Sequence, residues 1–255
     1  MSESINKNEE NILVGRNPVM EAMRSGREID KLFIMHASSG GSILPIIEKA
    51  RALKIPIKEV SKQKLDFMCG GAVHQGVAAL IAARSYCEIE DILKYAKDKN
   101  EDALVIICDG IEDPHNLGAI IRTAEAAGAH GIIIPKNRSV SLNATVAKAS
   151  SGALMHVNIC RVTNINSAID TLKQSGLWIY GADMDGETAY CADLTGPAAL
   201  VIGSEGHGIS RLTKEKCDVI LSLPMHGQVN SLNASVAAGV LMYEFVRQRN
   251  LSRHS

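Results

Sequence analysis

The sequence predicts an α/β protein whose C-terminal part is built on a mainly parallel sheet, preceded by a smaller α/β unit. Three observations predict this fold class. Short runs rich in β-branched residues alternate with helical patterns along most of the chain. Several of these runs are apolar throughout, as in strands that are buried on both faces. A charged, polar stretch at residues 85–103 separates two such alternations, which is typical of a linker between domains.

The composition is that of an ordinary soluble globular protein. The chain has 255 residues, of which 46% are hydrophobic and 22% are charged, with a formal net charge of −1. No apolar run is long enough to span a membrane, and the polar, acidic N-terminus is unlike a signal peptide. Six cysteines are scattered singly, without the spacing of a zinc or redox site. We therefore expect a cytoplasmic protein with reduced thiols and no metal.

The first unit covers residues 11–84 and follows a short N-terminus, residues 1–10, that we expect to be disordered. Its expected elements are strands at residues 12–15, 31–35, 55–60 and 76–82 and helices at residues 18–25, 43–53 and 62–68. Residues 10–83 contain ten Lys and Arg against seven Asp and Glu, an excess of three that a solvated surface explains as well as RNA does. The helix start after Gly15-Arg16-Asn17 can hold a phosphate, although a plain helix start is the commoner case.

The second unit covers residues 104–255 and repeats the alternation. Its expected strands are residues 103–110, 132–135, 156–162, 177–185, 200–202 and 219–223, and its expected helices include residues 165–174 and 234–246. Asp113 and Pro114 open another helix, as proline in a first turn does, and Gly128 ends it. The last helix is apolar on nearly all sides, which predicts burial in the core or in a subunit interface.

Two of the buried strands, residues 200–202 and 219–223, run directly into loops that we expect to share one crevice. The first loop, Gly203–Gly208, has three glycines, which allow the backbone to approach a ligand closely. It matches neither a dinucleotide fingerprint nor a P-loop, and Glu205 at its centre would repel a phosphate. A neutral or cationic ligand fits better, while a tight strand-to-helix turn is an equally good explanation of the glycines alone.

One sequence motif occurs twice. Residues 141–153 (SLNATVAKASSGA) nearly duplicate residues 231–240 (SLNASVAAGV). One copy could be structural and the other catalytic, or two alanine-rich helix starts could resemble each other by chance. The spacing does not decide between these interpretations.

Three blocks of sequence together resemble a known family. They are DPHNLGAIIRTAEAAG (Asp113–Gly128), LVIGSEGHGIS (Leu200–Ser210) and LPMHGQVNSLNASVAAG (Leu223–Gly239). In composition, order and spacing they are similar to the motifs of the SpoU branch of the SPOUT RNA ribose 2′-O-methyltransferases. VGRNPVMEAM (Val14–Met23) also resembles the start of that family's ribosomal-protein-like RNA-binding domain. One departure is Asn230, where Ser or Glu is commoner in the family.

The resemblance implies a fold, a cofactor and partners. The implied fold is a parallel sheet whose C-terminal segment forms a deep trefoil knot, which ordinary chain topology would not suggest. The implied cofactor is S-adenosyl-L-methionine, with backbone contacts from Gly203, Leu223 and Leu232. The implied substrate is RNA, since the whole-chain arrangement most resembles members that methylate a guanosine ribose of 23S rRNA, and the implied assembly is a homodimer joined near the active site.

The resemblance also implies a catalytic set of Asn116, Arg122, Glu205, Ser231 and Asn233. Asn116 and Asn233 would orient the ribose hydroxyl or each other, Glu205 would fix Asn116 or the loop, and Ser231 would hold Arg122. Because an arginine side chain ordinarily stays protonated, we expect Arg122 to clamp a phosphate and stabilise negative charge, not to act as a base. His115 and His207 adjoin two motifs, but lone histidines beside loops are more often incidental.

Other functions remain open on the sequence. A tRNA substrate is the nearest alternative. A non-catalytic RNA-binding relative is less consistent with the complete polar set. A dinucleotide-dependent oxidoreductase would need a glycine fingerprint and a ribose-binding acid, which the sequence lacks.

Overall fold

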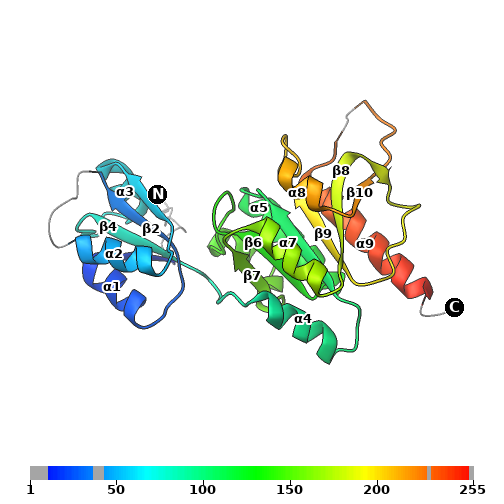
Figure 1. Ribbon diagram of the computed structural model, residues 1–255. Coiled ribbons are helices and arrows are strands. Elements are labelled where there is room, and N and C mark those ends of the chain that lie inside the picture. The colour runs from blue at the N-terminus through cyan, green and yellow to red at the C-terminus, as the bar shows by residue number, and fades with distance from the viewer. Residues whose placement is uncertain (1–10, 37–42, 229–230, 253–255) are drawn as a thin grey trace. The chain divides into compact units, whose positions relative to one another are not determined.

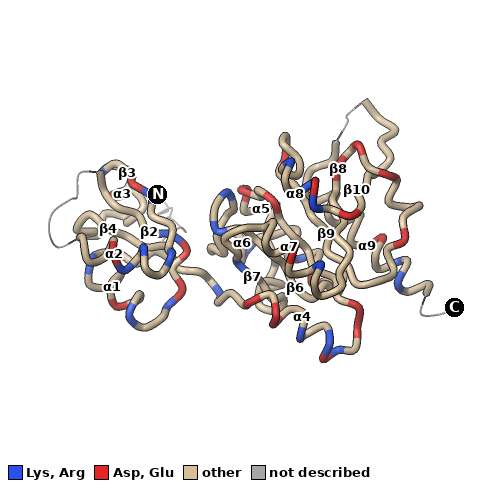
Figure 2. Tube along the Cα trace, in the orientation of Figure 1, with Lys and Arg blue, Asp and Glu red and all other residues tan. Residues whose placement is uncertain are grey.

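The computed structural model describes residues 11–36, 43–228 and 231–252, so the disorder expected for residues 1–10 lies outside the described part. The chain divides into two compact units (Figure 1). The first unit comprises residues 1–85 together with residues 141–144, and the second comprises residues 86–140 and 145–255. Basic and acidic residues are interspersed along both units (Figure 2), in keeping with the near-zero net charge.

The first unit is a four-stranded sheet with three described helices, in the sequence order that the patterns predict. Strand β4 lies between β1 and β2 and is antiparallel to both, whereas β2 and β3 are parallel. The elements are β1 (Ile12–Val14), α1 (Arg16–Arg24), β2 (Ile29–Met35), α2 (Leu44–Ala52), β3 (Ile57–Val60), α3 (Lys62–Met68) and β4 (Val77–Ile81).

The two faces of this sheet carry unequal cores. On one face, Leu32 and Ile34 pack with buried residues of α1 and α2 such as Val19 and Ile46. On the other face, Phe33 of β2 packs with a smaller cluster whose helical members come from α3 and its C-cap. Alternate residues of one strand point to opposite faces, so β2 contributes to both cores.

The second unit is a six-stranded sheet in the order β10-β8-β9-β5-β6-β7, with every neighbouring pair parallel. The mainly parallel α/β fold expected from the sequence is thereby confirmed. Its strands are β5 (Leu104–Asp109), β6 (Gly131–Pro135), β7 (Ile159–Val162), β8 (Trp178–Thr188), β9 (Ala198–Gly203) and β10 (Val219–Ser222). Its helical segments are α4 (Ile89–Asp98), α5 (Pro114–Ala126), α6 (Ala144–Ala149), η1 (Ala153–Met155), α7 (Ile165–Gln174), α8 (Arg211–Lys216) and α9 (Ala234–Ser252).

Strand β9 lies inside the sheet between β5 and β8, and all six of its residues are buried. Parallel pairing sets Asp109, the last residue of β5, opposite Gly203, the last residue of β9. The loops that follow both strands therefore start at the same edge of the sheet, which is where ligands bind in open α/β sheets.

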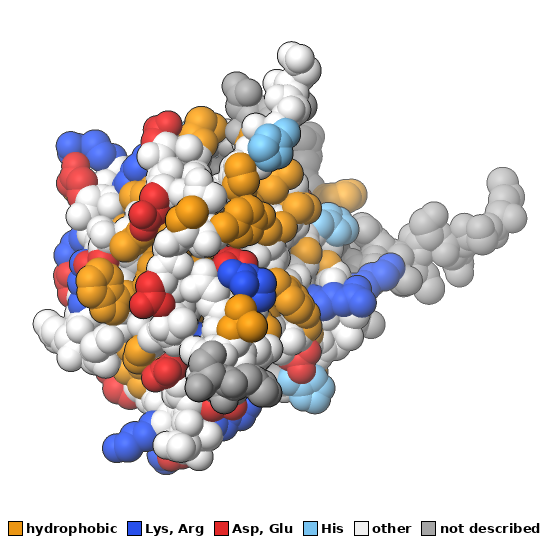
Figure 3. Space-filling model, turned by 90° about the vertical axis from the view of Figure 1, so that its right-hand side faces the viewer, with side chains coloured by type: hydrophobic (Ala, Val, Ile, Leu, Met, Phe, Trp, Pro, Cys, Tyr) orange, Lys and Arg blue, Asp and Glu red, His pale blue; other side chains and the backbone are white. Residues whose placement is uncertain are grey.

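One expectation needs correction. Helix α4 is not part of a free linker, because its residues Ile89, Ile92 and Ala96 belong to the core of the second unit. Val236, Val240 and Tyr243 of α9 are exposed in the single chain, so the expected burial of this helix on every side would require a subunit interface. Figure 3 views the protein from the side on which α9 ends, and hydrophobic side chains gather on that face. None of the described helices is both long and apolar enough to cross a lipid bilayer.

Candidate active site

The glycine loop after β9 is a closed turn held by its own backbone. Ser204 and Gly208 exchange two backbone hydrogen bonds, of 3.1 and 2.9 Å. Gly206 and Gly208 have φ angles of 82° and 64°, in the left-handed region that glycine adopts without strain. These two glycines are therefore needed to close the turn, and Glu205 lies exposed at its start.

Asp109 anchors this loop to the neighbouring strand. Its Oδ2 accepts a hydrogen bond of 2.9 Å from the backbone N–H of Ser210. The residue after it, Gly110, has a φ of 80°, and a Cβ there would lie 3.4 Å from the Cβ of Ser204. The sequence motifs do not mark Asp109, although an aspartate at the end of a buried strand is a pattern from which such a role can be inferred.

Gly203 has a different role from the one that the three-glycine pattern suggests. A Cβ built on it would lie 2.1 Å from the carbonyl carbon of Gly208 and 2.3 Å from the backbone nitrogen of Ile209. The space beside its Cα is thus filled by the loop's own backbone. Gly203 allows the loop to fold back against β9, and a larger residue would disturb the loop whether or not a ligand is bound.

Three of the expected catalytic residues meet in one polar cluster, which we call the amide–carboxylate cluster: Asn116, Glu205 and Asn233. The Asn116 Nδ2 donates to Glu205 Oε1 at 3.1 Å, and the Asn233 Nδ2 donates to Asn116 Oδ1 at 2.9 Å. The Asn233 Nδ2 also contacts Glu205 Oε1 closely. These residues come from α5, the loop after β9 and the start of α9. Asn116 and Glu205 are 89 positions apart in the sequence, and Glu205 and Asn233 are 28 positions apart.

Helix starts position both amides. Asp113 caps α5 by accepting a hydrogen bond of 2.9 Å from the His115 N–H, which fixes the first turn that carries Asn116. Asn233 caps α9 itself, because its Oδ1 accepts hydrogen bonds from the backbone N–H groups of Ser235 and Val236, at 3.0 and 3.3 Å. Asn233 is therefore the N-cap residue of α9.

The cap also fixes the direction of every amide in the cluster. Since the Asn233 oxygen faces helix α9, its NH₂ group must face Asn116 and Glu205. Asn116 then presents its oxygen to Asn233 and its NH₂ to Glu205. Glu205 receives both donors on Oε1, and its Oε2 has no hydrogen-bond partner among the described residues. That oxygen can accept a hydrogen bond from a bound hydroxyl group.

Arg122 lies apart from this cluster. Six residues separate it from Asn116, and at about 100° per residue the two side chains leave α5 in directions roughly 120° apart. Arg122 is exposed, whereas only 8% of Asn116 is exposed. The expected contact between Ser231 and Arg122 is not found among the described residues. Instead the Arg122 Nη1 donates to the Ser151 Oγ at 3.3 Å.

The two near-duplicate segments consequently do different things. The second copy supplies Asn233 to the amide–carboxylate cluster, and the end of the first copy supplies Ser151 to Arg122. Nothing in the sequence pattern pointed to Ser151, because the contact joins residues 29 positions apart. His115 and His207 are both exposed, and neither side chain forms a hydrogen bond with the described residues.

The residues expected to hold a cofactor fit an adenosine-bearing sulfonium compound in their chemistry. Leu223 directly follows β10, and the chain from there to Gln228 has no helix or strand to occupy its backbone groups. Leu232 is 39% exposed, an apolar side chain next to the polar cluster. Free strand-end backbone, an exposed apolar side chain and a nearby carboxylate suit a ligand with a flat base and a positive charge. In the described part of the chain, no group of three His, Cys, Asp or Glu side chains could hold a metal ion.

Comparison with known proteins places these features in a family. Residues 103–243 match the model of the SpoU rRNA methylase family, and residues 12–87 match that of the RNA 2′-O ribose methyltransferase substrate-binding domain. A protein of Bacillus subtilis named as a TrmH-family tRNA/rRNA methyltransferase, YacO, is 49% identical over 239 residues, which are 93% of this chain and 96% of that protein. A TrmH-family tRNA/rRNA methyltransferase of Staphylococcus haemolyticus is 50% identical over 245 residues, covering 95% and 97% of the two chains.

Solved structures agree with the sequence matches. The SpoU methyltransferase AviRb from Streptomyces viridochromogenes, crystallised with AdoMet, has a TM-score of 0.61 and 26% identity, covering 94% of this chain and 90% of that chain. The domain matches and the two relatives of about half-identical sequence cover nearly the whole protein. The chain therefore belongs to the SpoU rRNA methylase family, and it is an RNA methyltransferase of the SpoU/SPOUT type.

Proposed function

We propose that this protein transfers a methyl group from S-adenosyl-L-methionine to a ribose 2′-hydroxyl of RNA, with a guanosine of 23S rRNA as the substrate. The observation that carries the proposal is the amide–carboxylate cluster of Asn116, Glu205 and Asn233 beside the ends of β5 and β9. The match of residues 12–87 to a ribose methyltransferase substrate-binding domain supports a ribose acceptor.

Bound S-adenosyl-L-methionine would supply a methyl group that is already activated by its sulfonium, so the protein's task is alignment and proton removal. The backbone of Gly203, Leu223 and Leu232 would hold this cofactor. The AdoMet-bound neighbour AviRb supports S-adenosyl-L-methionine as the cofactor.

The amide–carboxylate cluster would orient the acceptor hydroxyl. Glu205 Oε2 is the acceptor that the cluster leaves open, and the two asparagines hold the carboxylate in place through Oε1. A hydroxyl that donates to Oε2 would be held in one orientation by the fixed Glu205 carboxylate. The lone pair of its oxygen could then point at the methyl group, which is the alignment that an in-line displacement needs. Ser231, exposed two residues before Asn233, would add a hydroxyl group at the rim of this site.

Arg122 would act on the RNA backbone. Its exposed guanidinium is held by one hydrogen bond to Ser151, which leaves further N–H donors for a phosphate next to the reacting ribose. A positive charge there would also stabilise the alkoxide that develops as the hydroxyl loses its proton.

The identity of the RNA is a separate question. The resemblance in whole-chain arrangement favours 23S rRNA, and the relatives are named as tRNA/rRNA methyltransferases. The tRNA alternative is supported by a TrmH/SpoU tRNA-modifying enzyme of Aquifex aeolicus, with a TM-score of 0.56 and 27% identity over 64% of this chain and 86% of that one. A cytoplasmic location is part of the proposal, and an RNA substrate is consistent with it.

Two further features complete the proposal. The C-terminal segment is proposed to form the trefoil knot of the family. The strand order supports this, since the chain leaves β9 for the far edge strand β10 and then returns in α9 to pack on α5 and β9. The protein is also proposed to act as a homodimer, which the exposed apolar residues Val236, Val240 and Tyr243 of α9 support.

Ribose methylation mapping in a deletion strain tests the substrate assignment. A single 2′-O-methyl site in 23S rRNA should disappear with the gene and return with the wild-type copy. Loss of a methyl group from tRNA alone would select the alternative. If no site in either RNA changes, the proposed function is wrong for this protein in its cell.

A further inference from the structure

We infer that the first unit holds one unpaired nucleobase of the RNA in a pocket beside Phe67, on the sheet face that α3 only partly covers. This inference rests on the proposed RNA substrate. It adds a base-binding site in the first unit, whereas the amide–carboxylate cluster belongs to the second unit. The pocket has a volume of about 190 Å³. It is lined by Asn11, Ile12, Phe33, Phe67, Met68, Leu80, Asn143 and Ala144.

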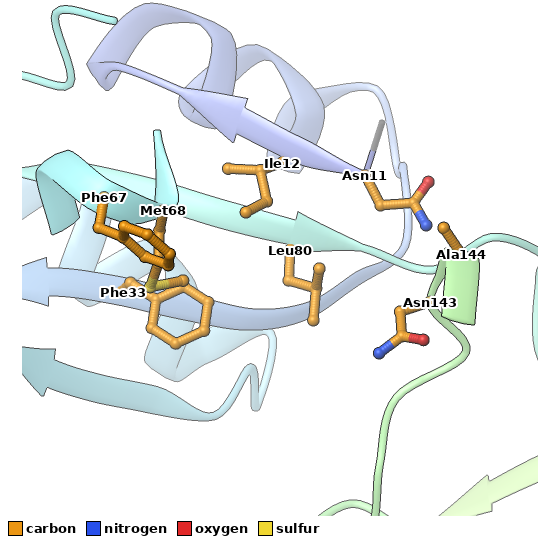
Figure 4. A pocket seen from close by; sticks show the side chains of 8 residues that line it. All are labelled: Asn11, Ile12, Phe33, Phe67, Met68, Leu80, Asn143 and Ala144. Carbon is orange, nitrogen blue, oxygen red and sulfur yellow. The ribbon is translucent and has the colours of Figure 1, made fainter. Parts of the chain in front are cut away.

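Figure 4 shows how these side chains are arranged. The rings of Phe67 and Phe33 lie at one end with Met68, the aliphatic side chains of Ile12 and Leu80 lie between, and the amides of Asn11 and Asn143 lie at the other end. An aromatic and aliphatic surface of this kind can stack the face of a base. The pocket is smaller than the roughly 300–1,000 Å³ of typical sites for drug-sized ligands, so it suits one base and not a large cofactor.

Phe67 is not part of the packed core. Its side chain is 71% exposed, whereas Leu65 of the same short helix is fully buried and Phe33 is 8% exposed. Leu65, Phe33 and Val60 already form the core on this face, and Phe67 is absent from that buried cluster. An exposed aromatic ring above a buried one is the arrangement on which single-stranded nucleic acids stack.

The charges around the pocket favour an anionic partner. Cα pairing places Lys58 of β3 beside Phe33 of β2, and strand geometry directs both to the same face. Lys62 and Lys64 lie on α3 with Phe67. All three lysines are exposed, and none has a carboxylate partner among the described residues.

The two acidic residues of the same stretch each contact a histidine side chain. The Glu59 Oε2 lies 3.2 Å from Nδ1 of His36, and the Asp66 Oδ1 lies 2.8 Å from Nε2 of His74. The segment Ile57–Met68 thus carries three lysines against two carboxylates, an excess of one positive charge beside an aromatic surface. Protein-binding surfaces are usually depleted in lysine, whereas RNA-binding ones combine basic and aromatic side chains.

Fluorescence of 2-aminopurine in a single-stranded oligoribonucleotide tests the inference on the full-length protein. Wild-type protein should quench the fluorescence on binding, because the base stacks on a ring. Phe67→Ala should bind this RNA on the order of tenfold more weakly with little quenching, as loss of one stacking residue does. Phe67→Trp should retain both affinity and quenching. The matched control is Leu53→Ala, another exposed apolar residue of the first unit, at the end of α2, which should match wild type.

A fully paired duplex of the same sequence is the second control, because its bases are not free to stack, and Phe67→Ala should bind it as wild type does. Equal single-strand affinity and quenching in Phe67→Ala and wild type would overturn the inference. A change of molar mass in Phe67→Ala would instead assign this surface to a protein partner and would also overturn it. The readout is independent of methyl transfer, so quenching without any methylation would contradict the proposed function and leave this inference intact.

Discussion

At the scale of single residues, the side-chain amide of Asn233 forms hydrogen bonds both with helix α9 and within the amide–carboxylate cluster. Its oxygen accepts from the first N–H groups of α9, and its nitrogen donates to Asn116 and Glu205. An aspartate at this position could still cap the helix, but it would have no N–H to donate and would place a second negative charge against Glu205. Substitutions at residue 233 can therefore keep the helix cap and remove the amide donor, or remove both.

We predict that Asn233→Asp and Asn233→Ala both lose activity, and that Asn233→Asp, which keeps the cap of α9, retains more of the thermal stability than Asn233→Ala does. Loss of the cap should cost about 1 kcal/mol of folding stability. Loss of a hydrogen bond to a charged group costs roughly 1.5–3 kcal/mol, which corresponds to a tenfold or hundredfold lower kcat/KM. Thermal unfolding and methyl transfer kinetics measure the two effects. Wild-type kcat/KM in Asn233→Asp would show that the amide donor does not position the reacting groups.

Arg122 gives a second prediction at this scale. If its guanidinium clamps a phosphate and stabilises developing charge, Arg122→Lys should retain part of the activity and Arg122→Ala very little, with cofactor affinity unchanged in both. Losing such a donor typically costs on the order of 3 kcal/mol, or about a hundredfold in rate. A base would behave differently, because a lysine side chain loses its proton near pH 10.4. A Lys variant whose rate rises steeply towards that pH and reaches the wild-type rate would contradict the assignment.

At the scale of elements, His130 connects the segment after α4 to the starts of β5 and β6. Its side chain is only 2% exposed, and its Nδ1 accepts from the Leu104 N–H at 3.0 Å. The proton must then be on Nε2, which donates to Glu101 Oε2 at 3.1 Å. Burial lowers the pKa of His130, and Glu101 opposes that effect while Lys99 and Arg249 add to it.

This depressed pKa predicts a stability that falls in acid. As the pH falls through about 6.5, the unfolded chain binds a proton at His130 and the folded protein does not, so the free energy of unfolding decreases. The slope from this one group is at most about 1.4 kcal/mol per pH unit, and it ends below the folded pKa. His130→Gln, which keeps a hydrogen-bonding amide but cannot titrate, should lose this contribution. Urea unfolding from pH 8 to pH 5 measures it. Parallel curves for the two proteins would exclude His130 as the responsible group.

The elements themselves were largely predictable from the sequence, because buried strands and capped helices leave local signals. The runs that became β5, β6 and β9 are apolar and β-branched, and Asp113-Pro114 marks the start of α5. Helix α4 was placed in a linker because its charged surface dominates its composition, while its three buried residues become visible only when they pack against Gly131 and its neighbours. The backbone contact of Gly203 with Gly208 likewise has no signature in the sequence.

The candidate site was predictable only in part, for a similar reason. Asn116, Glu205 and Asn233 were identified through family motifs, and the structure brings these three together. The partner of Arg122 was not predictable, because the contact with Ser151 depends on how two distant segments pack. Exposed polar contacts of this kind have no periodicity from which to infer them.

At the scale of the whole molecule, α9 presents an apolar stripe that the described residues of its own chain leave exposed. Val236, Val240 and Tyr243 are spaced four and three residues apart, so they share one face of the helix, and they are 50%, 38% and 51% exposed. In a homodimer joined across this stripe, a buried charge would be costly.

We predict that the wild-type protein has the molar mass of a dimer in solution and that Val240→Glu has that of a monomer. The control is Leu212→Glu. Leu212 is 57% exposed and lies on a different helix, α8, so that variant should stay dimeric. Light scattering after gel filtration measures the molar mass. A wild-type monomer at micromolar concentration, or a dimeric Val240→Glu protein, would contradict the interface on α9.

The most direct test of the account is nucleoside analysis by mass spectrometry after the purified protein has acted on RNA with deuterium-labelled S-adenosyl-L-methionine. Transcripts of 23S rRNA and tRNA are incubated separately, and Glu205→Ala serves as the inactive reference. The account predicts labelled 2′-O-methylguanosine from the 23S rRNA transcript, no label on any base, and almost none of the product from Glu205→Ala. Label found on a nucleobase, or equal labelling by wild type and Glu205→Ala, would contradict a ribose methyltransferase that works through the amide–carboxylate cluster.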